Sequence, residues 1–188
     1  MHEIDSLNYV KLDLLGLNAV GLIDGACKLA GIDYLTPDKV DFSDENVIKS
    51  IAEDTTLIFQ FESGFASDSL KRTLSKETLA NIKEQNDNIS YLDVMAMVSG
   101  AIRPAGESYR EQLFNGIYKD NGNEALNEFL KPTLGYLVYQ EQIIDFLHEF
   151  CGYTMGQADI VRRHFAKKTG TEEYEKALTE LEESLLGC

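Results

Sequence analysis

A lysine and an aspartate, Lys11 and Asp13, stand two residues apart in a short segment whose polar and apolar residues alternate. This alternation over residues 9–14 predicts a half-buried strand, with both side chains on the face opposite the apolar residues. Carboxylate oxygens are the ligands that Mg²⁺ prefers, and a lysine on the same face can meet a bound phosphate. The plainer explanation is a solvated strand face carrying an ion pair of little energetic value, so spacing alone leaves both interpretations open.

The second group with chemical potential is a short basic segment near the end of the chain. Residues 161–170 contain four cations and no acid, whereas residues 171–188 contain six glutamates and one lysine. The four cations are Arg162, Arg163, Lys167 and Lys168. On a helix, Arg163 and Lys167 lie one turn apart, so the segment can clamp a triphosphate or a nucleic-acid backbone. The alternative is a solvated helix face on which Asp159 pairs with Arg163.

The composition limits the kind of protein that carries these groups. The 188 residues are 44% hydrophobic and 26% charged, which is enough apolar material for a folded core and excludes general disorder. The formal net charge of −15 argues against a protein that binds nucleic acid over its whole surface. The longest charge-free run, residues 14–23, is too short to span a bilayer, and no signal-peptide pattern occurs. We therefore expect a cytoplasmic protein with no membrane partner.

Common catalytic and metal-binding motifs are missing from the sequence. The three cysteines and three histidines show no zinc-type spacing. Gly16 and Gly21 have the spacing of a phosphate-binding loop, but Leu22 stands where that loop requires lysine. No dinucleotide-binding glycine pattern and no nucleophile elbow occur. Ordinary hydrolase chemistry is therefore unsupported.

Nearly all of the chain after the predicted strand has helical spacing, which predicts a mainly α protein with one short strand. Apolar residues recur at three- and four-residue steps over residues 17–30, and Gly31 is the expected stop. The same spacing returns over residues 138–150, with Gly152 as the stop. A last helix is expected over residues 171–186.

Capping residues predict where further helices begin. The predicted starts are serines or threonines that precede apolar residues, namely Ser43, Ser75, Ser90, Ser108 and Thr154. Ser90 with Asp93, and Thr154 with Gln157, also have the spacing of a capping box. The helix that follows Ser43 is expected to continue through Ile51.

A series of short segments resembles the alpha subunit of bacterial DNA polymerase III, the family C replicative polymerase. The segments are residues 9–17 (YVKLDLLGL), 59–63 (FQFES), 101–104 (AIRP), 135–142 (GYLVYQEQ), 151–159 (CGYTMGQAD), and the basic pairs 162–163 and 167–168. Each is a weak signal alone, but their common order and spacing extend from about residue 8 to residue 170. The resemblance implies that residues 36–188 form a helical fingers domain and that residues 1–35 are the last strand and helix of a palm domain.

The resemblance also implies roles for individual residues. Asp13 takes the place of the third metal-binding carboxylate of the palm, which holds Mg²⁺ in the complete enzyme. The residues implied to bind the phosphates of the incoming deoxynucleotide are Lys11, Arg162, Arg163, Lys167 and Lys168. Of these, the Arg-Arg pair of the fingers approaches the triphosphate, and the two later lysines are looser candidates. Residues 59–63 and 139–142 match the family without a chemical role, and packing inside the fingers is expected of them.

Three departures from the family pattern bear on function. Ala105-Gly106 follow Arg103-Pro104 where Gly-Pro is usual, which predicts a changed local turn. Residues 164–166 (HFA) stand between the basic pairs where Met-Gly is expected, which can shift the phosphate-binding ridge. No two aspartates are separated by a single residue, so the Asp-x-Asp pair that completes the metal site in the family is missing.

These features predict a fragment of a DNA-directed DNA polymerase that is inactive by itself. Its expected partners are primer–template DNA, the deoxynucleotide and the rest of the polymerase chain. Two alternatives stay open: an acidic helical module that binds another protein without catalysis, and one chain of a phage-like polymerase that is split across two chains.

Overall fold

The computed structural model describes residues 16–166 and Thr179, and every regular element within residues 16–166 is helical. The α-helices are α2 (Asn18–Ala30), α3 (Glu45–Glu53), α4 (Gly64–Thr73), α5 (Lys76–Gln85), α6 (Tyr91–Ala101), α7 (Arg110–Phe114), α8 (Glu124–Leu130), α9 (Gln140–Cys151) and α10 (Met155–Ala166). Three 3₁₀ turns, at Pro37–Lys39, Pro104–Gly106 and Lys131–Thr133, connect them. The expected mainly α fold is thus confirmed. The strand predicted over residues 9–14 lies outside the described residues. So does the helix predicted over residues 171–186, except for Thr179.

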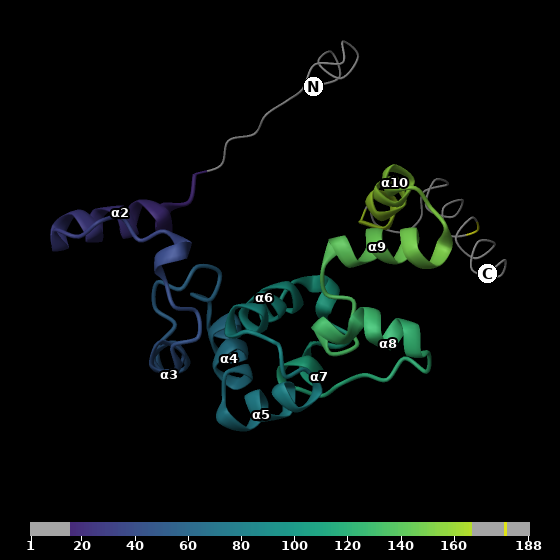
Figure 1. The fold of residues 1–188 in the computed structure, drawn as a ribbon, viewed down its shortest axis with the longest axis horizontal. Helices are drawn as coiled ribbons and strands as arrows, with labels where there is room; N and C mark the ends of the chain where they lie inside the picture. Colours follow the sequence, from purple (N-terminus) through teal and green to yellow (C-terminus); the bar gives the residue numbers. More distant parts are fainter. Residues whose placement is uncertain (1–15, 167–178, 180–188) are drawn as a thin grey trace, which may run out of the picture.

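The main hydrophobic core is formed by α3 to α7 and the segment that leads into α9. Its fully buried members include Leu70 of α4, Ile82 of α5, Met97 of α6 and Phe114 of α7, each with no exposed surface. Figure 1 shows these helices gathered in the lower part of the molecule. Tyr136, which precedes α9, is buried in the same core.

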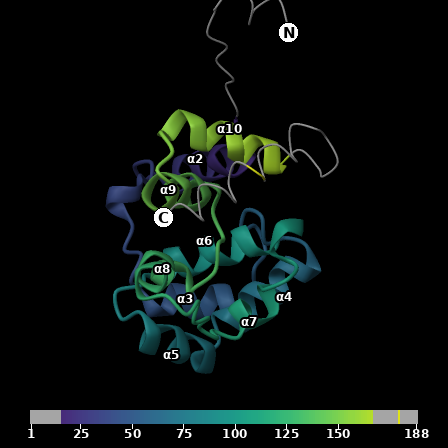
Figure 2. The same ribbon diagram turned by 90° about the vertical axis from the view of Figure 1, so that its right-hand side faces the viewer.

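A second, smaller core joins α9 to α10. Leu147 and Cys151 of α9 pack against Ala158 and Val161 of α10, and all four side chains are buried. Figures 1 and 2 both show the two helices lying next to each other above α5 and α7. Because the connection of residues 152–154 is short, α10 turns back onto α9 and packs across it (Figures 1 and 2).

Several helix ends lie where capping chemistry predicts them. Gly31 and Gly152 follow α2 and α9 in the left-handed conformation, with φ of 66° and 70°, which glycine adopts without strain. Ser75 caps α5 through a bond from the amide of Thr78, and Ser90 forms the predicted capping box with Asp93. These predictions from the sequence are confirmed.

Two predicted starts are wrong by one or two residues. The helix expected to start after Ser43 begins at Glu45 and ends at Glu53, because Asp44, not Ser43, accepts the capping bond from Asn46. The Ser43 hydroxyl instead donates to Asp41. The helix expected after Ser108 is the short α7, which follows Tyr109 and has no side-chain cap.

Two helices were not predicted at all. Helix α4 follows Ser63, whose hydroxyl accepts a bond from the amide of Ala66, and α8 follows Asn123, whose side chain accepts from Leu126. Both starts have suitable capping residues, but the apolar spacing after them is irregular. Their burial comes from packing against other helices, which local spacing does not report.

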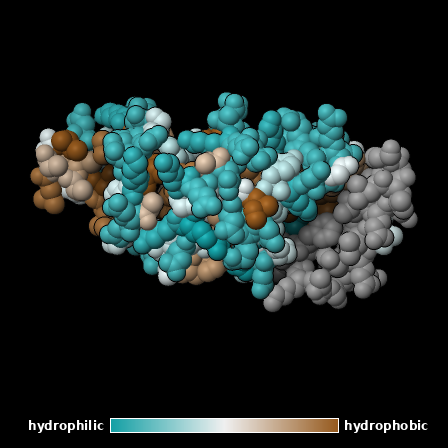
Figure 3. Space-filling view, turned by 90° about the horizontal axis from the view of Figure 1, so that it is seen from below, coloured by the Kyte–Doolittle hydropathy of each residue, from teal (hydrophilic) through white to brown (hydrophobic). Residues whose placement is uncertain are grey.

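Helix α2 stands apart from both cores. Cys27 is its buried residue, whereas Leu22 and Leu29 are 62% and 92% exposed. Figure 3 shows hydrophobic residues collected at the end of the molecule that α2 forms, while hydrophilic residues cover much of the rest of that face. None of the helices described here is long and apolar enough to cross a membrane.

Candidate functional site

The basic segment begins on α10, and a capping box fixes where this helix starts. Thr154 and Gln157 form the predicted capping box, with bonds of 3.0 and 3.4 Å between each backbone amide and the other side chain. From this start, Ala158 and Val161 point into the second core. Arg162, four residues after Ala158, therefore lies beside this buried face, whereas Arg163 lies further round the helix toward solvent.

Arg162 and Arg163 share one carboxylate, that of Asp159. Both the Nε and the Nη2 of Arg162 donate to Oδ1 of Asp159, at 3.0 and 2.8 Å. The Nη2 of Arg163 lies 2.6 Å from the other oxygen, Oδ2. The pair between Asp159 and Arg163, which was expected if the segment were only a solvated helix face, is thus present, and the structure adds Arg162 to it.

The two arginines differ in exposure and in their surroundings. The side chain of Arg162 is 18% exposed and that of Arg163 is 65% exposed. Arg162 also donates from Nη1 to Oε1 of Gln140, the first residue of α9, at 2.6 Å. Arg162 is therefore held between two helices, whereas Arg163 projects toward solvent.

The two arginines lower the pKa of Asp159. The hydrogen bond from Arg162 is the largest influence, and it lowers the pKa of this carboxyl below its usual value. Burial acts in the opposite direction and comes next, and the hydrogen bond and charge of Arg163 lower the pKa further. Asp159 is therefore ionised at neutral pH. Two guanidinium groups around one carboxylate leave a net positive charge, and guanidinium forks bind phosphate oxygens by the same geometry as carboxylate oxygens.

The other residues predicted to form a site are not brought together by the described structure. Lys11, Asp13, Lys167 and Lys168 lie outside the described residues. Across residues 16–166, no group of three or more acidic, histidine or cysteine side chains is arranged to hold a metal ion. The described part of the chain by itself therefore offers no cluster of oxygen ligands that fits Mg²⁺.

The two family-like segments without a predicted role both contribute to the main core, as expected. Phe61 is buried there, and Tyr139 packs against it. Around Phe61, the backbone of Leu57 and Gln60 is left-handed, with φ of 64° and 69°, and Gln60 accepts a bond from Ser99 of α6. The short turn is thus tied to α6.

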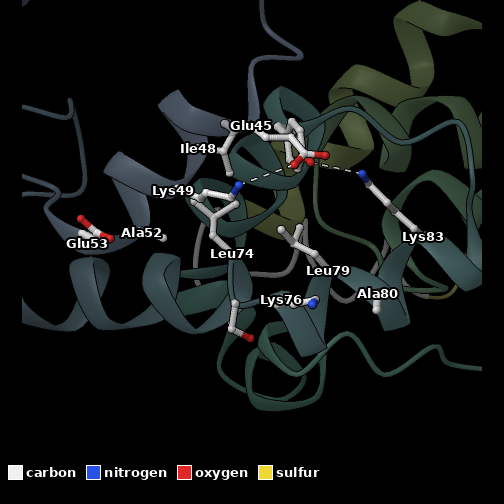
Figure 4. A pocket seen from close by; sticks show the side chains of 12 residues that line it. Glu45, Ile48, Lys49, Ala52, Glu53, Leu74, Lys76, Leu79, Ala80 and Lys83 are labelled. Atoms are coloured by element: carbon white, nitrogen blue, oxygen red, sulfur yellow. Dashed lines mark hydrogen bonds and ion pairs between the residues drawn. The ribbon is translucent and has the colours of Figure 1, made fainter.

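A hollow between α3, α5 and the start of α6 is separate from the arginine pair. It has a volume of about 620 Å³, an apolar floor that includes Ile48 and Leu79, and a rim with three lysines, Lys49, Lys76 and Lys83. Figure 4 shows Lys49 directed toward Glu45, and their charged groups lie 3.8 Å apart. Lys83 donates to the hydroxyl of Tyr91 at 3.3 Å. Two of its lysines are thus already engaged by neighbours.

The fold and the arginine pair define a helical domain with two neighbouring arginines on the α9–α10 helix pair. The chain belongs to the bacterial DNA polymerase III alpha subunit finger domain family, whose profile matches residues 20–186.

Individual relatives agree with this assignment. The chain is 29% identical over 182 residues to the DNA polymerase III subunit alpha of Helicobacter pylori (strain ATCC 700392 / 26695), which covers 89% of this chain and 14% of that protein. It is 30% identical over 177 residues to the protein of the same name from Campylobacter jejuni, covering 88% of this chain and 14% of the relative. It is 28% identical over 197 residues to the DNA polymerase III subunit alpha of Ureaplasma parvum, covering 99% of this chain and 18% of the relative. The chain therefore spans between one-seventh and one-fifth of the length of these relatives.

Proposed function

We propose that this chain is the fingers part of a replicative DNA polymerase alpha subunit and that Arg162 and Arg163 bind the phosphates of the incoming deoxynucleotide. The observation that carries the proposal is the pairing of both arginines at the single carboxylate of Asp159, which leaves a net positive charge and keeps Arg163 exposed to solvent. Family membership favours this role over that of an acidic interaction module.

The chemistry of the site supports an exchange of anions. Asp159 is one negative charge held by two positive ones, whereas a triphosphate brings several charged oxygens. An arriving triphosphate can therefore take over Arg163, which is the more exposed partner. The arginines would then neutralise charge on the phosphates while the polymerase transfers the nucleotide.

Residues outside the described part complete the proposal. Lys167 and Lys168 would extend the basic surface beyond the arginine pair, and Lys11 would meet the phosphates from the palm side. Asp13 would supply one carboxylate for Mg²⁺, which in such polymerases activates the primer hydroxyl and stabilises the leaving pyrophosphate. The remaining carboxylates, the primer–template DNA contacts and the rest of the palm would come from other parts of the polymerase chain.

The proposed division of the chain at residue 35 agrees with the burial pattern. Helix α2 lies before this point and exposes most of its apolar side chains, whereas α3 to α7 share the main core and α9 and α10 share the second core. An apolar helix without cover is expected when its packing partners belong to a neighbouring domain. Residues 1–35 would thus belong to the palm and residues 36–188 to the fingers, a later boundary than that of the family profile, which begins at residue 20 within α2.

The proposal is tested in the complete polymerase with Arg162→Ala and Arg163→Ala. Each substitution removes a charge-assisted hydrogen bond worth about 1.5–3 kcal/mol, so the affinity for deoxynucleotide should fall by roughly 10- to 150-fold. The matched control is Arg110→Ala, because Arg110 is also a half-buried arginine but stacks on Phe65, away from α10. Wild-type nucleotide affinity in both α10 variants would contradict the proposed function.

A further inference from the structure

Gln140 lies where two parts of the molecule meet. It is the first residue of α9, and its Oε1 accepts the 2.6 Å bond from Nη1 of Arg162, which is 22 residues later in the chain. The bond joins the start of α9 to the second half of α10. It therefore closes the α9–α10 pair at the end opposite the short connection.

The start of α9 is anchored firmly to the main core. Oε1 of Gln142 accepts bonds from the amides of Val138 and Tyr139, at 2.9 and 3.0 Å, and its Nε2 donates to Thr133 at 2.8 Å. Val138 also packs closely on α6, because a Cβ at Gly100 would lie only 2.6 Å from its Cγ1. The position of the backbone before Gln140 is thus fixed by buried contacts.

Arg162, in contrast, lies on α10, which packs in the second core, and it has a long, flexible side chain. A guanidinium group has five N–H donors, and the contacts described with Asp159 and Gln140 occupy three of them. Asp159 lies on the same helix and moves with Arg162. Gln140 is therefore the contact that orients the guanidinium relative to the main core.

We infer that Gln140 is a positioning residue for nucleotide binding, acting through Arg162, an inference that rests on the proposed function. With Gln140 in place, the remaining donors of Arg162 keep one direction and stay close to Arg163. Without it, the Arg162 side chain can rotate about Asp159, and the two arginines no longer present a fixed pair to a triphosphate. This gives a chemical role to the first glutamine of the GYLVYQEQ segment, while Gln142 holds the helix start.

The test uses single-nucleotide incorporation by the complete polymerase, which separates the dissociation constant of the deoxynucleotide from the maximal rate. Gln140→Ala should raise that dissociation constant by about 2- to 13-fold, the value of one ordinary hydrogen bond, with little change in the maximal rate. Gln140→Glu should restore most of the affinity, because it keeps an acceptor oxygen for Arg162. The control is Gln85→Ala, an exposed glutamine at the end of α5.

The double variant with Arg162→Ala shows whether Gln140 acts through Arg162. The double variant should bind the deoxynucleotide no more weakly than Arg162→Ala alone. Once Arg162 is absent, Gln140 has no side chain to position, so Gln140→Ala removes nothing further. Additive effects, or wild-type affinity in Gln140→Ala while Arg162→Ala is impaired, would overturn the inference. Wild-type affinity in Arg162→Ala and Arg163→Ala would instead overturn the proposed function. Gln140→Asn, whose amide is withdrawn by one methylene, should repeat the loss if Gln140→Ala fails to fold.

Discussion

The turn at Gly106 gives a stability prediction whose size follows from a single close approach. Gly106 ends the 3₁₀ turn Pro104–Gly106, and a Cβ at this position would lie 2.1 Å from the backbone oxygen of Ala101. An ordinary carbon–oxygen contact is about 3.3–3.6 Å, so Gly106→Ala must open the turn by more than about 1 Å. Ala101 is fully buried at the end of α6, so the displacement enters the main core.

Forcing an extra carbon into a packed core lowers the free energy of unfolding by about 1–3 kcal/mol. The loss for Gly106→Ala should lie near the upper value, because the atom in the way belongs to the backbone and cannot rotate aside. For a chain of this size, about 3 kcal/mol lowers the melting temperature by roughly 6–12 °C. Urea unfolding followed by circular dichroism measures the loss as a lower midpoint at unchanged slope.

The control is Gly64→Ala at the first residue of α4, where nothing lies within 4 Å of the added carbon. This change restricts the unfolded chain without a clash and should stabilise by about 0.4–1 kcal/mol. If Gly106→Ala were as stable as Gly64→Ala, the close packing of this turn on α6 would be refuted.

Three further predictions concern titration and DNA. Because Asp159 has a lowered pKa in the folded state, its contribution to stability is present above the ordinary carboxyl pKa and is lost as the pH falls through the folded value. Acid unfolding curves of Asp159→Asn and the original chain should therefore converge at low pH, and a constant difference would contradict this. Burial raises the pKa of Tyr139 to about 12, so the folded state is stabilised below the ordinary tyrosine pKa and loses this stabilisation as the pH rises toward 12. Tyr139→Phe should flatten the alkaline part of the stability curve, and an unchanged curve would count against the burial. Because the chain carries a net charge of −15, it should bind primer–template no more tightly than about 10⁻⁴–10⁻⁶ M by fluorescence anisotropy; nanomolar binding or primer extension would show a self-sufficient enzyme.

The structure also shows how the family-like segments cooperate. Gln60 accepts a hydrogen bond from Ser99 of α6. The next residue, Gly100, packs closely against Val138 of the segment before α9. Gln140 then continues the connection to Arg162 on α10. Segments widely separated in sequence therefore form one continuous series of contacts that ends at the proposed phosphate-binding residues.

Much of the secondary structure could be predicted because its causes are local. The stops at Gly31 and Gly152, and the capping boxes at Ser90 and Thr154, depend on bonds between residues within a few positions of one another. Helices α4 and α8 escaped prediction because their burial depends on neighbouring helices. The one-residue error at Ser43 arose because Asp44 competes for the same capping role.

The sequence by itself determined the helical class, the family resemblance and the two arginines that we propose as phosphate contacts. It also identified Asp159 as a partner of Arg163, since residues four apart on a helix are neighbours. Only the tertiary structure decided that Arg162 is held between Asp159 and Gln140 while Arg163 stays exposed. The reason is distance along the chain: the bond from Arg162 to Gln140 spans 22 residues, and its partner is chosen by how α9 packs on α10, which no local spacing records.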